Sequence, residues 1–169
     1  MPVTHVLGYV GRISEQDEAR IDPSNYAGTH HIGKLGLERF YESVLHGQVG
    51  YQKVESNALG RIIKVLDGVD AVPGRNIQLH LDLPTQLAAL EGLGDRRGAV
   101  VALDPSTGGI LAFVSTPSYD PNPFVTGIDF ASYAALNENP DRPLVNRALQ
   151  GQYPPGSTIK PLVALAGIE

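Results

Sequence analysis

Apolar and polar positions in the second half of the chain follow patterns typical of strands. The two kinds of side chain alternate over Asn76–Asp82, which is the period of a half-buried strand. Two apolar runs, Gly98–Leu103 and Ile110–Thr116, flank a loop of turn-forming residues, so they are predicted to pair as an antiparallel hairpin. These three segments together predict an antiparallel sheet.

Helical spacing of apolar residues predicts three helices in the same half. The first, Leu83–Leu93, has a proline near its first turn, where proline is well tolerated. A short helix is predicted over Phe130–Leu136. An apolar helix is predicted over Ser157–Ile168, after the rigid turn Pro154–Gly156, and is expected to pack on the sheet.

The first half of the chain reads as shorter elements separated by turns. The predicted elements are a strand within Thr4–Ile13, a capped helical turn at Ser14–Glu18, an amphipathic helix over Leu35–Leu45, and two strands, Gly50–Val54 and Arg61–Leu66, joined by a turn. Gly68–Gly74 resembles a linker, which puts a domain boundary near residue 72. The chain is therefore predicted to be an α+β protein with domains at 1–72 and 73–169.

Composition narrows the function classes. The 169 residues are 42% hydrophobic, which is enough to bury a core, and 13 basic against 18 acidic residues give a net charge of −5. This balance argues against a nucleic-acid-binding protein, which needs a basic face. The absence of cysteine excludes disulfides and a thiol nucleophile, and no apolar run reaches the ~20 residues of a membrane span. The sequence indicates no cofactor.

The strongest candidate for chemistry is Ser157-Thr158-Ile159-Lys160. A serine hydroxyl is a weak nucleophile unless a neighbouring base takes its proton. If Ser157 opens a helix, Lys160 lies one turn further on the same face, and the free N–H groups of the helix start favour developing negative charge. Apolar neighbours are expected to depress the pKa of Lys160, so that its amine is free to act as the base.

The S-x-x-K motif alone is weak, and a capping serine beside a solvated lysine explains most occurrences. Here the context favours chemistry, because Ser157 is the only serine with a lysine three residues later, and a proline-proline-glycine turn precedes it.

Two other motifs are weaker candidates for a functional site. Gly28–Lys34 fits G-x-x-x-x-G-K, but it lacks both the following Ser or Thr and a preceding apolar strand. Three histidines, His30, His31 and His46, could suggest a zinc site, but no nearby carboxylate has the spacing of a metal ligand on a helix. Turn formation explains three aspartates: Asp82, Asp104 and Asp120.

Four segments resemble the class B penicillin-binding proteins. Gln152–Pro161, which reads QYPPGSTIKP, is similar to their active-site segment, and Arg97–Asn122 is similar to the strands that open their transpeptidase domain. The end of their non-catalytic pedestal region is similar to Gly33–Tyr41, which is followed by Leu45–Gly47, and to Gly60–Ile63. The resemblance implies an α+β fold that joins the end of the pedestal to the first part of the transpeptidase domain.

The resemblance also implies a function. The family cross-links peptidoglycan stem peptides that end in D-Ala-D-Ala, through an acyl-serine intermediate, and β-lactams acylate the same serine. On this basis Ser157 is the expected nucleophile and Lys160 its expected base. No metal and no cofactor are expected. The family implies partners among the cell-elongation membrane proteins and a location on the periplasmic face of the bacterial inner membrane.

The chain departs from the family pattern because the S-x-N and K-[ST]-G motifs are missing. The nearest approach to the second motif is Lys34-Leu35-Gly36, in the wrong region. The chain is therefore expected to be an internal fragment without its membrane anchor, inactive alone, and prone to self-association through an open sheet edge. The alternative is a non-catalytic structural or interaction module of the cell-wall elongation machinery.

Overall fold

The computed structural model describes residues 2–168. The chain begins with a helical turn, α1 (Thr4–Leu7), followed by β1 (Tyr9–Arg12), which pairs antiparallel with β2 (His31–Leu35). The short strand predicted within Thr4–Ile13 is therefore present as β1, and a helical turn occupies the residues before it. The hydroxyl of Thr4 donates to the distant carbonyl of Tyr119, so a tertiary contact helps to hold this segment as a helical turn. Gly8 follows at φ 77°, and a Cβ there would lie 1.9 Å from the Leu35 carbonyl oxygen.

A capped turn of helix, α2 (Glu15–Glu18), lies between these two strands as predicted. The Ser14 hydroxyl and amide both donate to the Asp17 carboxylate, at 2.6 and 2.9 Å. The helix predicted over Leu35–Leu45 is interrupted at Tyr41, which gives α3 (Gly36–Phe40) and α4 (Glu42–Leu45).

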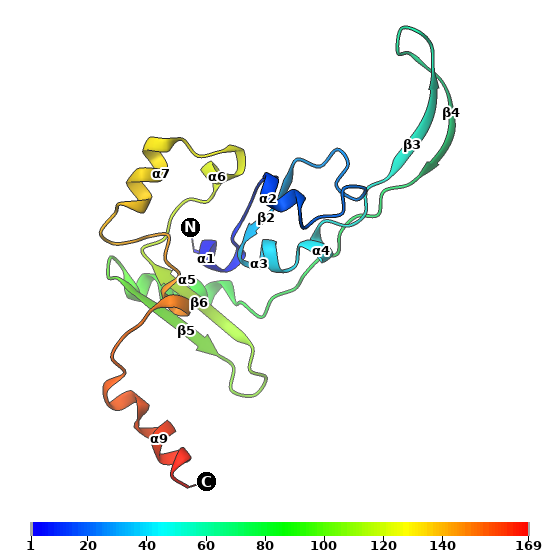
Figure 1. The fold of residues 1–169 in the computed structure, drawn as a ribbon. Helices are drawn as coiled ribbons and strands as arrows, with labels where there is room; N and C mark the ends of the chain where they lie inside the picture. Colours follow the sequence, from blue (N-terminus) through cyan, green and yellow to red (C-terminus); the bar gives the residue numbers. More distant parts are fainter. Residues whose placement is uncertain (1, 169) are drawn as a thin grey trace.

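The two strands predicted around residues 55–60 form an antiparallel hairpin of β3 (Tyr51–Ser56) and β4 (Ile62–Val69). The side-chain oxygen of Asn57 accepts from the amides of Leu59 and Arg61 and closes the turn. Figure 1 shows this hairpin extending away from the rest of the molecule, and every residue of both strands is exposed.

The strand predicted over Asn76–Asp82 is wrong as an element, although its alternation is present. Ile77, Leu79 and Leu81 are half-buried and the residues between them are exposed, but the segment has no ladder. The Asp82 amide donates to the Leu111 carbonyl. Among the described residues this is the one backbone hydrogen bond between the segment and the neighbouring hairpin. The alternation arises because the segment runs along the protein surface.

The predicted hairpin of the second half is confirmed in strand bounds and in direction: β5 (Gly98–Leu103) pairs antiparallel with β6 (Ile110–Thr116). The helix α5 (Leu83–Leu93) also has the predicted bounds and packs against β6. The core is small and includes Ala112 and Val114 of β6. Together with the pairs β1–β2 and β3–β4, these elements confirm an α+β fold of small antiparallel sheets.

Three short helices follow β6: α6 (Asn122–Thr126), α7 (Phe130–Asn137) and α8 (Arg147–Gln150). The ring of Phe124 on α6 lies against Tyr9 of β1, with ring centroids 4.8 Å apart, and against Tyr119. These rings attach the N-terminal elements to the second half. None of the helices in residues 2–168 is both long and apolar enough to cross a membrane.

The chain ends with a 3-10 turn, η1 (Gly156–Ile159), and α9 (Lys160–Ala166). The predicted helix is present, but its expected packing on the sheet is wrong. Every residue from 151 to 168 is exposed, and the helix points away from the β5–β6 hairpin (Figure 1). Apolar side chains such as Leu162, 66% exposed, lack a covering element among the described residues.

Candidate active site

Ser157 and Lys160 lie one tight turn apart. Gly156 adopts φ 54°, a conformation that favours glycine, and lets the chain enter η1. The Lys160 amide donates to the Ser157 carbonyl, and Pro161 occupies the first turn of α9. The structure therefore brings the predicted nucleophile and base together at the start of a helix, with a 3-10 rather than an α-helical first turn.

The side chains of this pair face solvent. Within residues 2–168 no hydrogen bond joins the Ser157 hydroxyl to the Lys160 amine. The apolar surroundings expected for Lys160 are wrong for this chain, because Ile159 is 42% and Val163 is 63% exposed. A free amine needs a desolvated position, so this geometry brings a hydroxyl and an amine onto one turn but does not supply the enclosure that would activate them.

Hydrogen bonds to β6 and α1 hold the segment that precedes Ser157 and Lys160 in the chain. We call residues 141–153 the approach segment. The Ser115 hydroxyl, on the mostly apolar β6, donates to the Val145 carbonyl at 3.2 Å and accepts from the Arg147 amide at 3.0 Å. The Asn146 side-chain amide donates to the carbonyl of His5 in α1 at 3.1 Å.

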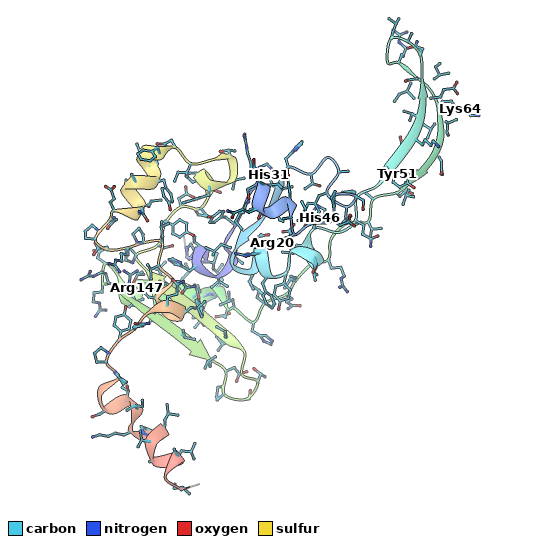
Figure 2. The ribbon with its side chains drawn as sticks, in the orientation of Figure 1. Arg20, His31, His46, Tyr51, Lys64 and Arg147 are labelled. Carbon is cyan, nitrogen blue, oxygen red and sulfur yellow. The ribbon has the colours of Figure 1, made fainter. Side chains whose placement is uncertain are left out.

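Figure 2 shows Arg147 in the middle of the approach segment, close to the β5–β6 hairpin. Its guanidinium donates to the carbonyl of Arg142 at 3.1 Å and to that of Asp141. The approach segment is thus attached to β6, to α1 and to itself. Sequence reasoning missed these residues. A polar residue within the apolar run of β6 was an available signal for Ser115, whereas nothing in the pattern marked Asn146.

Another missed residue, Gln86 of α5, closes the outer edge of β6. Its side chain is 1% exposed. The amide group accepts from the Phe113 N–H at 2.6 Å and donates to the Phe113 carbonyl at 2.9 Å and the Pro2 carbonyl at 2.6 Å. The Gln86 side-chain amide therefore makes the two hydrogen bonds to Phe113 that a backbone peptide group of a further strand would make.

The G-x-x-x-x-G-K segment leads into β2 rather than a helix, and its lysine serves structure. Lys34 donates to the carboxylate of Asp17 and forms an ion pair with it. Burial raises the pKa of Asp17, but hydrogen bonds from Lys34 and Ser14 outweigh it and lower the pKa to about 2. The lysine is thus held by a carboxylate that competes with any phosphate.

The clustered histidines occupy separate surroundings. His46 stacks on Tyr26 with ring centroids 4.0 Å apart, and its Nε2 lies 3.2 Å from the Thr29 hydroxyl. The His31 ring contacts the Val125 carbonyl at 3.2 Å and lies apart from His46 (Figure 2). Across residues 2–168 no group of three or more potential ligands is placed to hold a metal ion.

Two of the three aspartates assigned to turns, Asp104 and Asp120, are confirmed in that role, whereas Asp82 caps a helix instead. Asp82 caps α5 by accepting from the Thr85 amide at 3.0 Å. Asp104 accepts from Ser106 and Thr107 in the β5–β6 loop, and these hydrogen bonds lower its pKa to about 2. Asp120 accepts from Asn122 at the start of α6.

Comparison with known proteins places two family models on the chain. A model described as the penicillin-binding protein dimerisation domain matches residues 2–79, and one described as the penicillin-binding protein transpeptidase domain matches residues 98–169. The second match includes the Ser157–Lys160 pair.

Individual relatives agree with these models. The chain is 54% identical over 170 aligned residues to peptidoglycan D,D-transpeptidase MrdA of Escherichia coli, and the alignment covers 98% of this chain and 27% of that protein. A crystal structure of Pseudomonas aeruginosa PBP2 in complex with WCK 5153 is 56% identical, with a TM-score of 0.86, over 99% of this chain and 33% of that one. A structure of the complex between PBP2 and MreC from Helicobacter pylori is 36% identical with a TM-score of 0.87. The match covers 98% of this chain and 30% of that one.

Proposed function

Because the chain belongs to the penicillin-binding proteins, we propose that the whole protein is a peptidoglycan D,D-transpeptidase. The observation that carries the proposal is the Ser157-x-x-Lys160 pair at a helix start, inside the segment that the transpeptidase model matches. The chain spans about 27% of the length of its curated relative from E. coli, so the activity belongs to the whole protein and not to these residues alone.

The proposed reaction has two steps. The Ser157 oxygen attacks the carbonyl carbon of the penultimate D-Ala of a stem peptide while the Lys160 amine takes the hydroxyl proton. The peptide C–N bond breaks, and the terminal D-Ala leaves with a proton on its nitrogen. An amine of a second stem peptide then attacks the acyl ester, which forms the cross-link and frees Ser157.

In this proposal β-lactams act as substrate mimics that acylate Ser157. We further propose that the pedestal part covers residues 1–72 and the transpeptidase part residues 73–169. The H. pylori complex with MreC supports a partner from the cell-elongation membrane proteins. We place the active site on the periplasmic face of the inner membrane, where peptidoglycan is assembled.

The test is labelling of the whole protein with a fluorescent penicillin. Ser157→Ala is expected to abolish labelling, because the acceptor oxygen is gone. Lys160→Ala is expected to slow acylation by roughly 10²–10⁴-fold, since one general base contributes about that much. Both substitutions only shorten a side chain and leave the backbone turn in place, so melting temperatures should hardly change. A matched control is Lys64→Ala, an exposed lysine on the β3–β4 hairpin (Figure 2).

Undiminished labelling of Ser157→Ala would refute the assigned nucleophile. Absence of labelling in the unmodified whole protein would instead favour the non-catalytic alternative. A specific observation keeps that alternative testable: the β3–β4 hairpin is fully exposed and carries apolar side chains such as Leu59 and Ile62. In that case pull-down with an elongation protein should depend on the hairpin and not on Ser157.

A further inference from the structure

We infer that Asn146 is a positioning residue for Ser157, which ties the approach segment to the N-terminal helix α1. The inference rests on the proposed function, because Ser157 matters here as a nucleophile. It goes beyond that function in assigning a role to the contact between two parts of the chain that lie 141 residues apart.

The contact between Asn146 and α1 is protected from solvent. His5, which supplies the carbonyl, is 8% exposed, and Thr4 beside it is 3% exposed. The side-chain oxygen of Asn146 is buried without a hydrogen-bond partner. The bond to His5 is therefore the one hydrogen bond that fixes this side chain among the described residues, and breaking it would leave the buried His5 carbonyl without that donor, which is costly.

Around Asn146 the backbone is held on both sides. The Ser115 hydroxyl, on a residue 4% exposed, contacts Val145 on one side and Arg147 on the other. Arg142 has a positive φ of 44°, unusual for a residue with a side chain, and the Arg147 guanidinium holds its carbonyl at 3.1 Å. The segment has few ways to move while these bonds last.

The constraint continues from Arg147 toward Ser157. The Gly151 amide donates to the Arg147 carbonyl at 3.0 Å. A Cβ on Gly151 would lie 2.4 Å from that carbonyl oxygen and 2.6 Å from the Tyr153 ring, so this bend of the chain has no space for a residue larger than glycine. Two prolines with fixed φ follow, and the Thr158 amide donates to the Pro155 carbonyl at 3.2 Å. Few residues separate Asn146 from η1, and these restraints on the backbone between them are the route by which a shift at Asn146 would reach Ser157.

This path joins the two family segments. His5 lies in the part that the dimerisation model matches and Asn146 in the part that the transpeptidase model matches. Loss of the Asn146 bond should release the approach segment from α1 without touching Ser157 or Lys160. Because a misplacement of about 1 Å can reduce rates ~100-fold, we expect acylation to slow by roughly 10- to 100-fold in Asn146→Ala.

A matched control is available in Thr4→Ala. The Thr4 hydroxyl also joins α1 to the second half, through the Tyr119 carbonyl at 3.2 Å, but it does not contact the approach segment. Both variants remove one interdomain hydrogen bond from α1. Ser115→Ala is a second variant, which loosens the approach segment from the β6 side, in case Asn146→Ala fails to fold.

The experiment uses the whole protein and two measurements. The first is the second-order rate constant of acylation by fluorescent penicillin, with melting temperature alongside. The second is hydrogen exchange of the peptides covering residues 147–160, which does not depend on activity. We expect slower acylation and faster exchange in Asn146→Ala and Ser115→Ala, and neither change in Thr4→Ala.

Equal slowing in Thr4→Ala and Asn146→Ala would overturn the inference, since it would indicate a general loss of stability. Unchanged exchange over residues 147–160 in Asn146→Ala would also overturn it. If the unmodified protein is never acylated while exchange responds as expected, the proposed function fails and the structural link stands.

Discussion

Replacement of Gln86 by leucine tests how β6 is held at its outer edge. Leucine is close to glutamine in volume, so Gln86→Leu leaves little cavity on α5. It removes all three hydrogen bonds of the buried amide: two with the backbone of Phe113 and one with the Pro2 carbonyl. The N–H and C=O of Phe113 then face an apolar side chain.

The magnitude follows from these bonds. One intramolecular hydrogen bond contributes about 1 kcal/mol net, and a buried group left unpaired costs about 1–3 kcal/mol. Three lost bonds, partly offset by the added apolar burial, give a local destabilisation of about 3 kcal/mol. Since about 1.4 kcal/mol corresponds to tenfold, exchange of the Phe113 amide should accelerate by about two orders of magnitude.

The assay is hydrogen exchange of the β6 peptide in the whole protein. Gln78→Leu is a matched control, because Gln78 is exposed and lies on the surface segment before α5. We expect β6 exchange to be unchanged in the control. If Gln86→Leu and Gln78→Leu exchange at the same rate over β6, the edge does not depend on Gln86 and the reasoning fails.

Two further predictions concern the behaviour of the isolated chain and the stability of the fold at low pH. A polypeptide of these 169 residues should form no covalent adduct with benzylpenicillin in intact-mass spectrometry, and a stoichiometric adduct on Ser157 would contradict this. It should also self-associate in light scattering, because the edge of β5 is unpaired in the described part and Leu162 is 66% exposed. By NMR titration Asp17 should have a pKa of about 2. Its depressed pKa stabilises the fold above about pH 4, and this stabilisation is lost as pH falls toward 2. Lys34→Met should raise the Asp17 pKa, and an unchanged pKa would show that Lys34 does not hold the carboxylate.

Local patterns in the sequence were enough for elements whose stability is mainly local. The bounds of α5, β5 and β6 followed from periodicity and turn residues, and so did the β3–β4 hairpin. The S-x-x-K motif likewise located the candidate pair by composition and spacing. The roles of Ser157 and Lys160 stay a prediction.

Long-range contacts decided what the patterns could not. Thr4–Leu7 forms a helical turn whose Thr4 hydroxyl bonds to the Tyr119 carbonyl 115 residues away. Asn76–Asp82 alternates without a ladder, because in the described part only its last residue bonds to the neighbouring strand β6. The roles of Gln86, Ser115 and Asn146 exist only once distant backbone groups approach them. The sequence by itself determined which short segments form, because hydrophobic period and turn chemistry act over a few residues. Only the tertiary structure decided which buried polar side chains join those segments, because a hydrogen bond requires its partner to be in place.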